Sequence, residues 1–323
     1  LDNLVKGAAG RRCRPSTSRS ASTSAMGCAE EGDATVPESP QAVAAGPIVL
    51  KLGGELVDSP MAAERTAALI ARSAGQRPIV VVHGGGREIN AELAKAGFDK
   101  RAVDGLRVTD QTTLDLVVGV LAGRVNTRLV AAVTQAGIPA VGLTGADDSI
   151  GLCRRAEPYR ALDGSTVDLG FVGQPVSTEA PRLLDRLRRA GFTPVIACIG
   201  VTEDGQLLNV NADALAAQLA VNLKAGRLVI AGTTPGVLGS DGRSVERLDD
   251  AAIDDLKARG DVSAGMVAKL DACRMASEGG VEAVVIADGR ETIDLELLPG
   301  TVVVARRAPI DAPGAAASQE SRS

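Results

Sequence analysis

The chain has 323 residues, 45% of them hydrophobic and 23% charged, and a formal net charge of −5 at pH 7. This length accommodates one large domain or two small ones, with enough apolar material for a substantial core. The acidic balance and the 1% aromatic content argue against a nucleic-acid-binding protein, and no apolar run approaches the roughly 18–20 residues that cross a bilayer.

The two ends of the chain differ from its centre. Residues 1–46 are rich in Ser, Ala, Gly, Pro and Arg without hydrophobic periodicity, which predicts disorder. The basic bias up to Met26 superficially resembles an organelle transit peptide. Since the chain begins with Leu1, we favour Met26 as the true start. We accordingly expect a cytoplasmic location. The tail over residues 309–323 is small and polar and is expected to be flexible.

Short β-branched runs alternate with helical patterns between these ends. Each run is nearly continuous in apolar residues, as strands buried on both faces of a parallel sheet are. The alternation predicts an α/β domain, with helices on both faces of a mainly parallel sheet. The predicted strands are Ile48–Leu52, Ile79–Val82, Ala140–Leu143, Pro194–Ala197, Leu228–Ala231 and Ala283–Ile286.

One helical pattern carries a long apolar stripe, in which apolar residues recur with the spacing of a single helical face. Two polar stretches interrupt the alternation, around Val103–Thr109 and Tyr159–Val172, and are expected to form hairpins or lids over a site. The residues of the stripe are Leu114, Val117, Val118, Leu121, Val125 and Leu129.

Several common motifs are absent from the sequence. It has no P-loop, no Rossmann G-x-G-x-x-G and no protein-kinase H-R-D or D-F-G. Its five cysteines are dispersed without a C-x-x-C pair, which fits reduced cytosolic thiols better than disulfides or a zinc site. His83 is the only histidine, so a His-rich metal cluster is excluded.

Glycine clusters follow two of the predicted strands and precede helical segments. They are Gly53-Gly54 and Gly84-Gly85-Gly86. Such turns expose backbone N–H groups at a helix N-terminus, where the dipole favours anions, and glycine allows close approach. Tight packing explains one such cluster equally well. Two clusters at the carboxyl ends of neighbouring strands predict that both hold one phosphoryl group.

Two lysines offer positive charge to such a group, as phosphoryl transfer requires. Lys51 lies in an otherwise apolar strand and is expected to reach a partner or a ligand, because a buried unpaired ammonium is costly. The structural alternative is a side chain that extends to solvent from a strand end. Lys269 follows Gly265 near a predicted helix start. By itself it is more typical of a solvated surface lysine.

Leu207–Ala214 has two amides and a carboxylate at the expected start of a helix. Asp213 either caps that helix or fixes the two lysines, with Asn209 and Asn211 as hydrogen-bonding groups for a substrate. Arg107 either holds a substrate carboxylate in a bidentate fork or lies on the surface of a hairpin. An acceptor carboxylate with a pKa of about 4 is ionised at neutral pH and needs no general base.

Together these motifs resemble the amino acid kinase family, and within it the acetylglutamate kinases. The resemblance covers about residues 47–304. G-L-R-V-T and N-V-N-A-D are the more specific motifs and point away from aspartate, carbamate, glutamate 5- and uridylate kinases. The motifs are K-L-G-G at 51–54, H-G-G-G at 83–86, G-L-R-V-T at 105–109, N-V-N-A-D at 209–213 and G-M-x-x-K at 265–269.

The resemblance implies an open three-layer αβα sandwich over residues 47–308, in which about 47–225 bind the amino acid and about 226–308 bind ATP. It implies transfer of the ATP γ-phosphoryl group to the γ-carboxylate of N-acetyl-L-glutamate in arginine biosynthesis, with Mg²⁺ carried by the nucleotide. By this resemblance Lys51, Lys269 and Asp213 are catalytic. Substrate binding is expected at Gly84, Gly85, Arg107 and Asn209, and phosphoryl or ATP binding at Gly53, Gly54, Gly86, Asn211, Thr233 and Gly236.

The chain departs from the family pattern in two places. Relatives usually carry Thr/Ser-Asp-Val where this chain has Gly232-Thr233-Thr234, which puts the detail of the ATP site in question. The apolar stripe matches a dimer-forming helix. Residues 1–46, however, lack the amphipathic helix of arginine-inhibited hexamers, and Leu297–Thr301 is a short version of their C-terminal segment. A homodimer with little arginine feedback is therefore expected.

Two other functions stay open on the sequence. One is a regulatory or catalytically weak module of the same fold that binds an amino acid or a nucleotide, supported by Thr233 alone. The other is a kinase for a differently acylated glutamate, because Arg107 and Asn209 recognise only the amino-acid end of the substrate.

Overall fold

The computed structural model describes residues 46–305, with the exception of residues 162, 240 and 293. The expectations for the first 45 residues and for the 309–323 tail lie outside the described residues. The boundary at about residue 225 between an amino-acid-binding part and an ATP-binding part stays a prediction.

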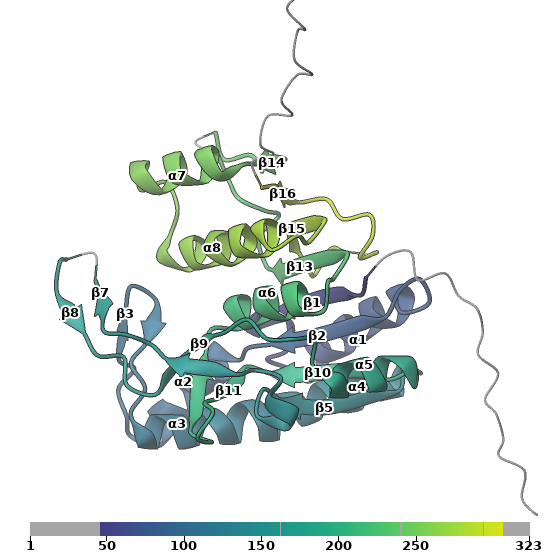
Figure 1. Cartoon of the computed structure of the whole chain (residues 1–323), viewed down its shortest axis with the longest axis horizontal. Coiled ribbons are helices and arrows are strands. Elements are labelled where there is room, and N and C mark those ends of the chain that lie inside the picture. The colour runs from purple at the N-terminus through teal and green to yellow at the C-terminus, as the bar shows by residue number, and fades with distance from the viewer. Residues whose placement is uncertain (1–45, 162, 240, 293, 306–323) are drawn as a thin grey trace, which may run out of the picture. The chain divides into compact units, whose positions relative to one another are not determined.

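An eight-stranded sheet in the order β14-β16-β15-β13-β1-β2-β10-β5 forms the centre of the described fold (Figure 1). Neighbouring strands are parallel, except that β15 and β16 are antiparallel. All six predicted strands are confirmed, whereas β14 and β16 were missed. The strands are β1 Ile48–Leu52, β2 Ile79–His83, β5 Ala140–Thr144, β10 Thr193–Ala197, β13 Arg227–Gly232, β14 Arg247–Leu248, β15 Ala283–Asp288 and β16 Thr301–Val303.

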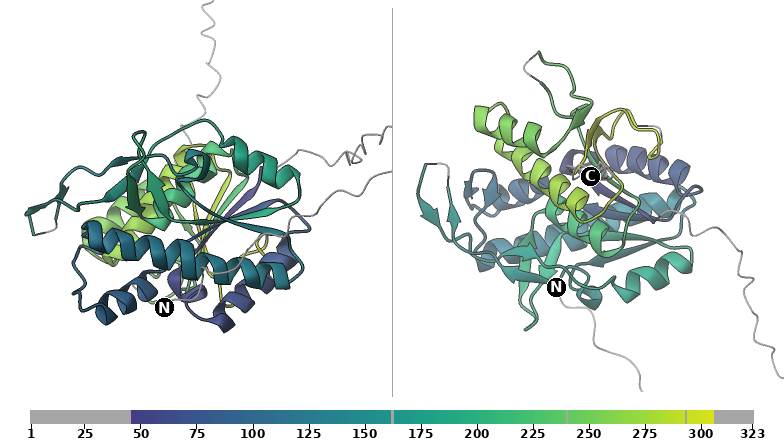
Figure 2. Two further views of the ribbon diagram at one scale, coloured as in Figure 1. Left: turned by 90° about the horizontal axis from the view of Figure 1, so that it is seen from below. Right: turned by 45° about the horizontal axis from the view of Figure 1, so that its top comes forward.

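Helices cover both faces of this sheet, and the predicted three-layer α/β sandwich is confirmed. Helices α1 to α4 lie on one face, and α5, α6 and α8 lie on the other (Figures 1 and 2). The helices are α1 Pro60–Ser73, α2 Gly86–Lys95, α3 Gln111–Val118, α4 Thr127–Gln135, α5 Arg182–Arg189, α6 Ala212–Asn222, α7 Asp250–Arg259 and α8 Ala264–Glu278.

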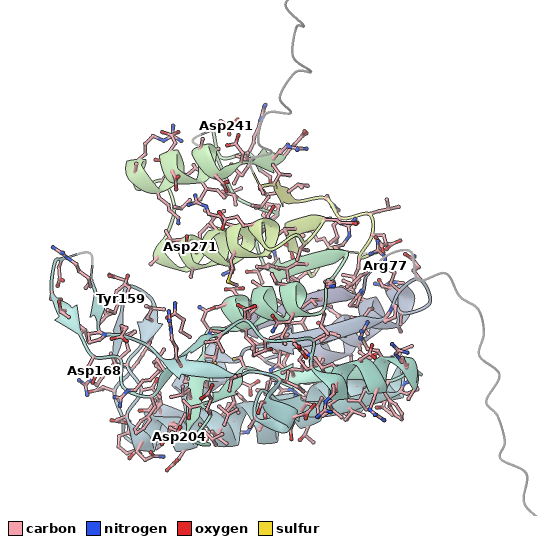
Figure 3. All side chains as sticks on the ribbon, in the orientation of Figure 1. Arg77, Tyr159, Asp168, Asp204, Asp241 and Asp271 are labelled. Atoms are coloured by element: carbon pink, nitrogen blue, oxygen red, sulfur yellow. The ribbon has the colours of Figure 1, made fainter. Side chains whose placement is uncertain are left out.

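Smaller sheets and hairpins lie beside the main sheet. The two polar stretches form hairpins, as predicted: β3 Ala102–Val103 with β4 Leu106–Arg107, and β7 Tyr159–Arg160 with β8 Thr166–Val167. The two hairpins approach each other, since burial and the nearby Asp104 carboxylate both raise the pKa of the Tyr159 hydroxyl; Figure 3 labels Tyr159. A four-stranded sheet contains β11 Ile199–Val201, β12 Leu207–Val210, β9 Val172–Pro175 and β6 Cys153–Arg155.

The two central strands are buried at every position, including their polar residues. Lys51 near the end of β1 and His83 at the end of β2 are both buried. Because β1 and β2 are parallel and in register, Leu52 beside His83, both glycine clusters follow at the same edge of the sheet. Two polar side chains and two glycine turns therefore lie together at the carboxyl ends of β1 and β2.

A continuous helix from Gln111 to Gln135 differs from the prediction in two respects. Its middle, Gly119–Asn126, is a π-helix (η2), which the apolar stripe does not reveal. It is also the one helix in the described residues long and apolar enough to span a membrane, which corrects the expectation of no such run. A soluble core helix passes the same test. The residues of the stripe that are buried here are Leu114, Val117, Leu121, Val125 and Leu129.

We predict that this helix belongs to the core of a folded domain in water. Leu129 is fully buried, so Leu129→Ala should lower the free energy of unfolding by about 3 kcal/mol through the cavity that it leaves. Thr134→Ala, at an exposed position of the same helix, should change it by less than about 0.5 kcal/mol. Urea unfolding without detergent measures both variants. Equal losses would contradict the core assignment.

Candidate active site

A buried ion pair lies at the carboxyl end of β1. Lys51 Nζ is 2.8 Å from Asp213 Oδ1, and both side chains are less than a tenth exposed. Lys269 Nζ, from α8, lies 3.9 Å from the other oxygen of Asp213. Three elements far apart in the sequence thus bring two ammonium groups to one carboxylate. The structural alternative for Lys51, a solvent-directed side chain, is wrong, whereas the Lys269 side chain stays a quarter exposed and its role stays a prediction.

The start of α6 places Asp213 in this cluster. The helix cap is Asn211, whose Oδ1 accepts hydrogen bonds from the N–H groups of Asp213 and Ala214. The alternative that Asp213 caps the helix is therefore wrong, because the carboxylate lies within the first turn and points to the lysines. Asn211 uses its oxygen for the cap and still lines the cavity described below.

The two glycine turns are adjacent. The N–H of Gly53 donates to the Ala231 carbonyl at 2.9 Å, and the N–H of Gly84 to the Leu52 carbonyl at 3.4 Å. A Cβ on Gly54 would lie 3.4 Å from the backbone nitrogen of Gly86. The turns therefore face each other closely enough for one anion to contact both.

A cavity of about 290 Å³ opens beside the second glycine turn. Asn209 contributes an amide whose Nδ2 donates to Thr109 Oγ1 at 3.1 Å. The polar and charged lining comes from Gly84, Gly85, Gly86, Asn90, Lys100, Arg107, Asn209 and Asn211. The substrate-binding residues predicted from the sequence all lie in this set.

Arg107 is held in the cavity wall with one nitrogen unused. Its Nη2 donates to the Asn90 side-chain oxygen and, at 3.5 Å, to the Gly86 carbonyl. Its Nη1 is buried and has no hydrogen-bond partner among the described residues. Burial lowers the pKa of the guanidinium, which nevertheless stays charged at neutral pH. A half-buried cation with a free donor suits a carboxylate, and the surface alternative for Arg107 is wrong.

The lysine–aspartate cluster adjoins this cavity without lining it. Cys198 lines the cavity and is close enough to Lys51 and Asp213 for their charges to affect its pKa, which burial raises to about 12. A Cβ on Gly84 would lie 3.5 Å from the Ala212 Cβ, next to Asp213 in the chain. An acceptor in the cavity therefore has its reacting end near the ammonium groups.

Thr233 and Gly236 stand apart from the cluster. Within residues 46–305, no hydrogen bond or ion pair joins either of them to Lys51, Asp213 or Lys269. The Thr233 carbonyl accepts from Arg290 Nη2 at 2.8 Å, and Arg290 pairs with Asp288. Gly236 has φ +143° and packs closely against Ser244 and Thr301, which accounts for a glycine without any ligand. Their roles at an ATP site stay predictions.

The only histidine lies behind the second glycine turn. His83 Nδ1 is 3.0 Å from the Gly84 carbonyl, and Nε2 is 3.1 Å from Asn126 Nδ2. Burial lowers the pKa of His83 from its ordinary 6.5 to about 4, and the nearby charge of Arg128 acts in the same direction. The imidazole is therefore neutral at physiological pH.

Several polar residues that shape the site are not predicted from the sequence. Asn90 and Lys100 line the cavity, Thr109 orients Asn209, and Asn126 contacts His83. Arg128 donates to the Val57 carbonyl and pairs with Glu88. A signal existed for Asn126, because a polar residue between the apolar positions 125 and 129 must find a partner when buried.

An open α/β sandwich with paired glycine turns and converging ammonium groups is an arrangement suited to phosphoryl transfer. Residues 46–288 match the amino acid kinase family. The chain belongs to this family.

Individual relatives extend this assignment. The chain is 41% identical over 250 residues to an acetylglutamate kinase from Parvibaculum lavamentivorans, which covers 75% of this chain and 81% of that protein. It is 41% identical over 254 residues to an acetylglutamate kinase from Methanopyrus kandleri. This match covers 76% of this chain and 98% of that protein. The solved structure of smu.665 from Streptococcus mutans superposes with a TM-score of 0.65 at 26% identity, covering 80% of this chain and 98% of that one.

We predict that His83 makes stability depend on pH. Between pH 4 and 6.5, His83 is protonated in the unfolded chain but stays neutral in the folded chain. The contribution is therefore complete above the ordinary pKa of 6.5 and is lost as pH falls towards 4. The loss amounts to about 3 kcal/mol. Urea unfolding of the wild type and of His83→Gln across this pH range measures the loss. A difference in the free energy of unfolding between the two proteins that does not change with pH would contradict the prediction.

Proposed function

We propose that this protein transfers the γ-phosphoryl group of ATP to the γ-carboxylate of N-acetyl-L-glutamate, giving N-acetyl-γ-glutamyl phosphate in arginine biosynthesis. The observation that carries the proposal is the meeting of Lys51, Asp213 and Lys269 beside a cavity lined by an arginine with one unused donor, Nη1. The relatives at about 40% identity, which are acetylglutamate kinases, support the choice of acceptor.

The proposed step needs positive charge more than it needs a base. A γ-carboxylate oxygen attacks the γ-phosphorus of ATP, the bond from that phosphorus to the bridging oxygen breaks, and ADP leaves with that oxygen. Lys51 and Lys269 offset the negative charge on the transferring oxygens, and Asp213 holds both ammonium groups in place. The acceptor is already ionised at neutral pH, so the buried neutral His83 is not required for proton removal.

The acceptor fits the cavity by its two carboxylates. Arg107 and Asn209 are placed to bind the α-carboxylate, the first through its unused Nη1. The γ-carboxylate would then extend to the N–H groups of the second glycine turn, which lines the same cavity.

ATP would approach along the first glycine turn, at the carboxyl edge shared by β1 and β13. The two ammonium groups suit its phosphates. We propose that Mg²⁺ arrives bound to the nucleotide, since phosphate oxygens are ligands that it prefers. The described residues contain no group of three or more His, Cys, Asp or Glu that could hold a metal ion.

We predict that purified wild-type protein releases ADP in the presence of ATP and N-acetyl-L-glutamate. Lys269→Ala should lower kcat by about 10²-fold, because one charge around the transferring group is lost. Lys51→Ala should lower it at least as much, but it also leaves Asp213 buried without its nearer partner and is expected to destabilise the fold. Lys95→Ala, which removes an exposed lysine of α2, is the control and should have full activity.

Calorimetry and the ADP-release assay together separate the alternatives. Binding of ATP and N-acetyl-L-glutamate by calorimetry without ADP release would favour a regulatory module. ADP release with N-succinyl-L-glutamate, and not with the N-acetyl compound, would favour a differently acylated acceptor. Full activity in Lys269→Ala and Lys51→Ala would contradict the roles given to these residues.

We further propose that the enzyme is a homodimer joined through the outer side of the Gln111–Gln135 helix. Leu116 and Val118 are only half-buried there, and Gly119 and Gly123 are exposed, which leaves apolar and small residues for a second copy. Sedimentation velocity should show a dimer that arginine does not change, and Val118→Glu should weaken it. An arginine-responsive hexamer would contradict this prediction.

A further inference from the structure

The π-helical part of the long helix inserts a polar side chain into the sheet. Because π-helical hydrogen bonds join residues five apart, Asn126 faces the sheet on the same side as Leu121 and is buried. Its Nδ2 donates to the Val195 carbonyl at 2.9 Å and lies 3.4 Å from the Leu143 carbonyl. Gly142 makes room for it, since a Cβ there would come within 2.2 Å of Asn126 Oδ1.

Two contacts of His83, with Asn126 and with Gly84, together fix which imidazole nitrogen has the proton. An amide nitrogen can only donate a hydrogen bond, so His83 Nε2 accepts from Asn126 Nδ2 at 3.1 Å. The proton of the neutral ring is then on Nδ1, which donates to the Gly84 carbonyl at 3.0 Å. Asn126 thus acts on Gly84 through the imidazole.

The position of the Gly84 carbonyl determines the direction of the next N–H group. The peptide bond is planar and trans, so the Gly85 N–H points opposite to the Gly84 carbonyl and away from the imidazole. Gly84 and Gly85 both line the acceptor cavity. Among the residues that the structure describes, the Gly85 N–H has no hydrogen-bond acceptor, so it is available to a ligand.

The long helix also supports the turns from behind. A Cβ on Gly85 would lie 2.7 Å from Leu121 Cδ2 and 3.3 Å from Val125 Cγ2, so glycine is required here by close packing. Arg128 of the same helix donates to the Val57 carbonyl, at the end of the short 3₁₀ helix Gly54–Leu56 that follows Gly53. One helix therefore contacts the segments that contain both turns.

We propose that Asn126 and His83 are positioning residues, which form a relay of hydrogen bonds that directs the Gly85 N–H at the acceptor carboxylate. The role at the carboxylate rests on the proposed function, whereas the relay itself does not. Neither residue touches the substrate. Their effect is to keep one backbone donor in the orientation that acceptor binding needs.

The single histidine makes the relay directly observable. The full chain, labelled with ¹⁵N-histidine and purified without a histidine tag, should show a protonated Nδ1 and an unprotonated Nε2 at neutral pH. Asn126→Ala and Gly142→Ala, which remove or displace the amide donor, should each weaken this preference and raise the population of the ring protonated on Nε2. A wild-type ring protonated on Nε2, or an unchanged tautomer in both variants, would overturn the proposal whether or not the protein has kinase activity.

Kinetics test the consequence for the acceptor. Asn126→Ala should raise KM for N-acetyl-L-glutamate about tenfold, the effect of about one hydrogen bond, and leave KM for ATP within about twofold. Asn222→Ala is the matched control. Asn222 is a buried amide of α6 that bonds Thr178 and Gln218, so its loss should lower stability comparably without changing the tautomer or either KM. An acceptor KM that rises equally in both variants would reduce Asn126 to a structural role and overturn the proposal.

An isosteric variant, Asn126→Asp, should show a pH dependence of the acceptor KM that a loss of stability would not produce. The carboxylate of Asn126→Asp accepts from Nε2, so Nδ1 keeps its proton only when the ring is positively charged. The acceptor KM of this variant should therefore rise with pH as His83 loses its proton, despite the opposing charge of Arg128 on α4. The wild-type KM should not follow this titration. A pH-independent acceptor KM in Asn126→Asp would overturn the relay.

Discussion

A lysine ammonium buried at the end of a strand requires a counter-charge, and this requirement sets the arrangement of the site. Lys51 meets it through Asp213 at 2.8 Å, because an unpaired charge at this depth costs several kcal/mol. The pairing places the start of α6 beside β1, where the Asn211 cap fixes the direction of the helix. Since α8 packs on α6, Lys269 also approaches the carboxylate. One ion pair thus organises three segments that the sequence keeps far apart.

The acceptor side of the site depends on backbone geometry more than on charged side chains. The glycine turns are held from the sheet by β1 and β2, and from the helical layer by Leu121, Val125 and Arg128. His83 is enclosed between these layers as a neutral ring. A histidine next to a glycine turn suggests a general base, but the burial of His83 and its two hydrogen bonds suit it to positioning the turn instead.

The sequence predicts the main sheet well because strands buried on both faces leave continuous apolar runs, and the motifs locate Lys51, Asp213, Lys269 and Arg107. It fails where partners are distant or helical geometry is irregular. An apolar stripe fits an α-helix and a locally wider helix alike, so the π-helix at Gly119–Asn126 was missed. The N-cap of α6 is Asn211 and not Asp213, because the helix begins at Ala212 and Asp213 is already in its first turn. Asn90 and Lys100 carry no motif, and only the fold brings them to Arg107.

The strand order also constrains how the chain is made. Ile48 of β1 pairs with Ile79 on one side and with Arg227 on the other. One neighbour of this central strand therefore lies much later in the sequence. While the polypeptide leaves the ribosome, β1 can join β2 early, yet its second edge remains uncovered until β13 emerges. Uncovered apolar edges invite pairing with other chains. We therefore expect β1 of the newly made chain to stay open to chaperones until β13 has been synthesised.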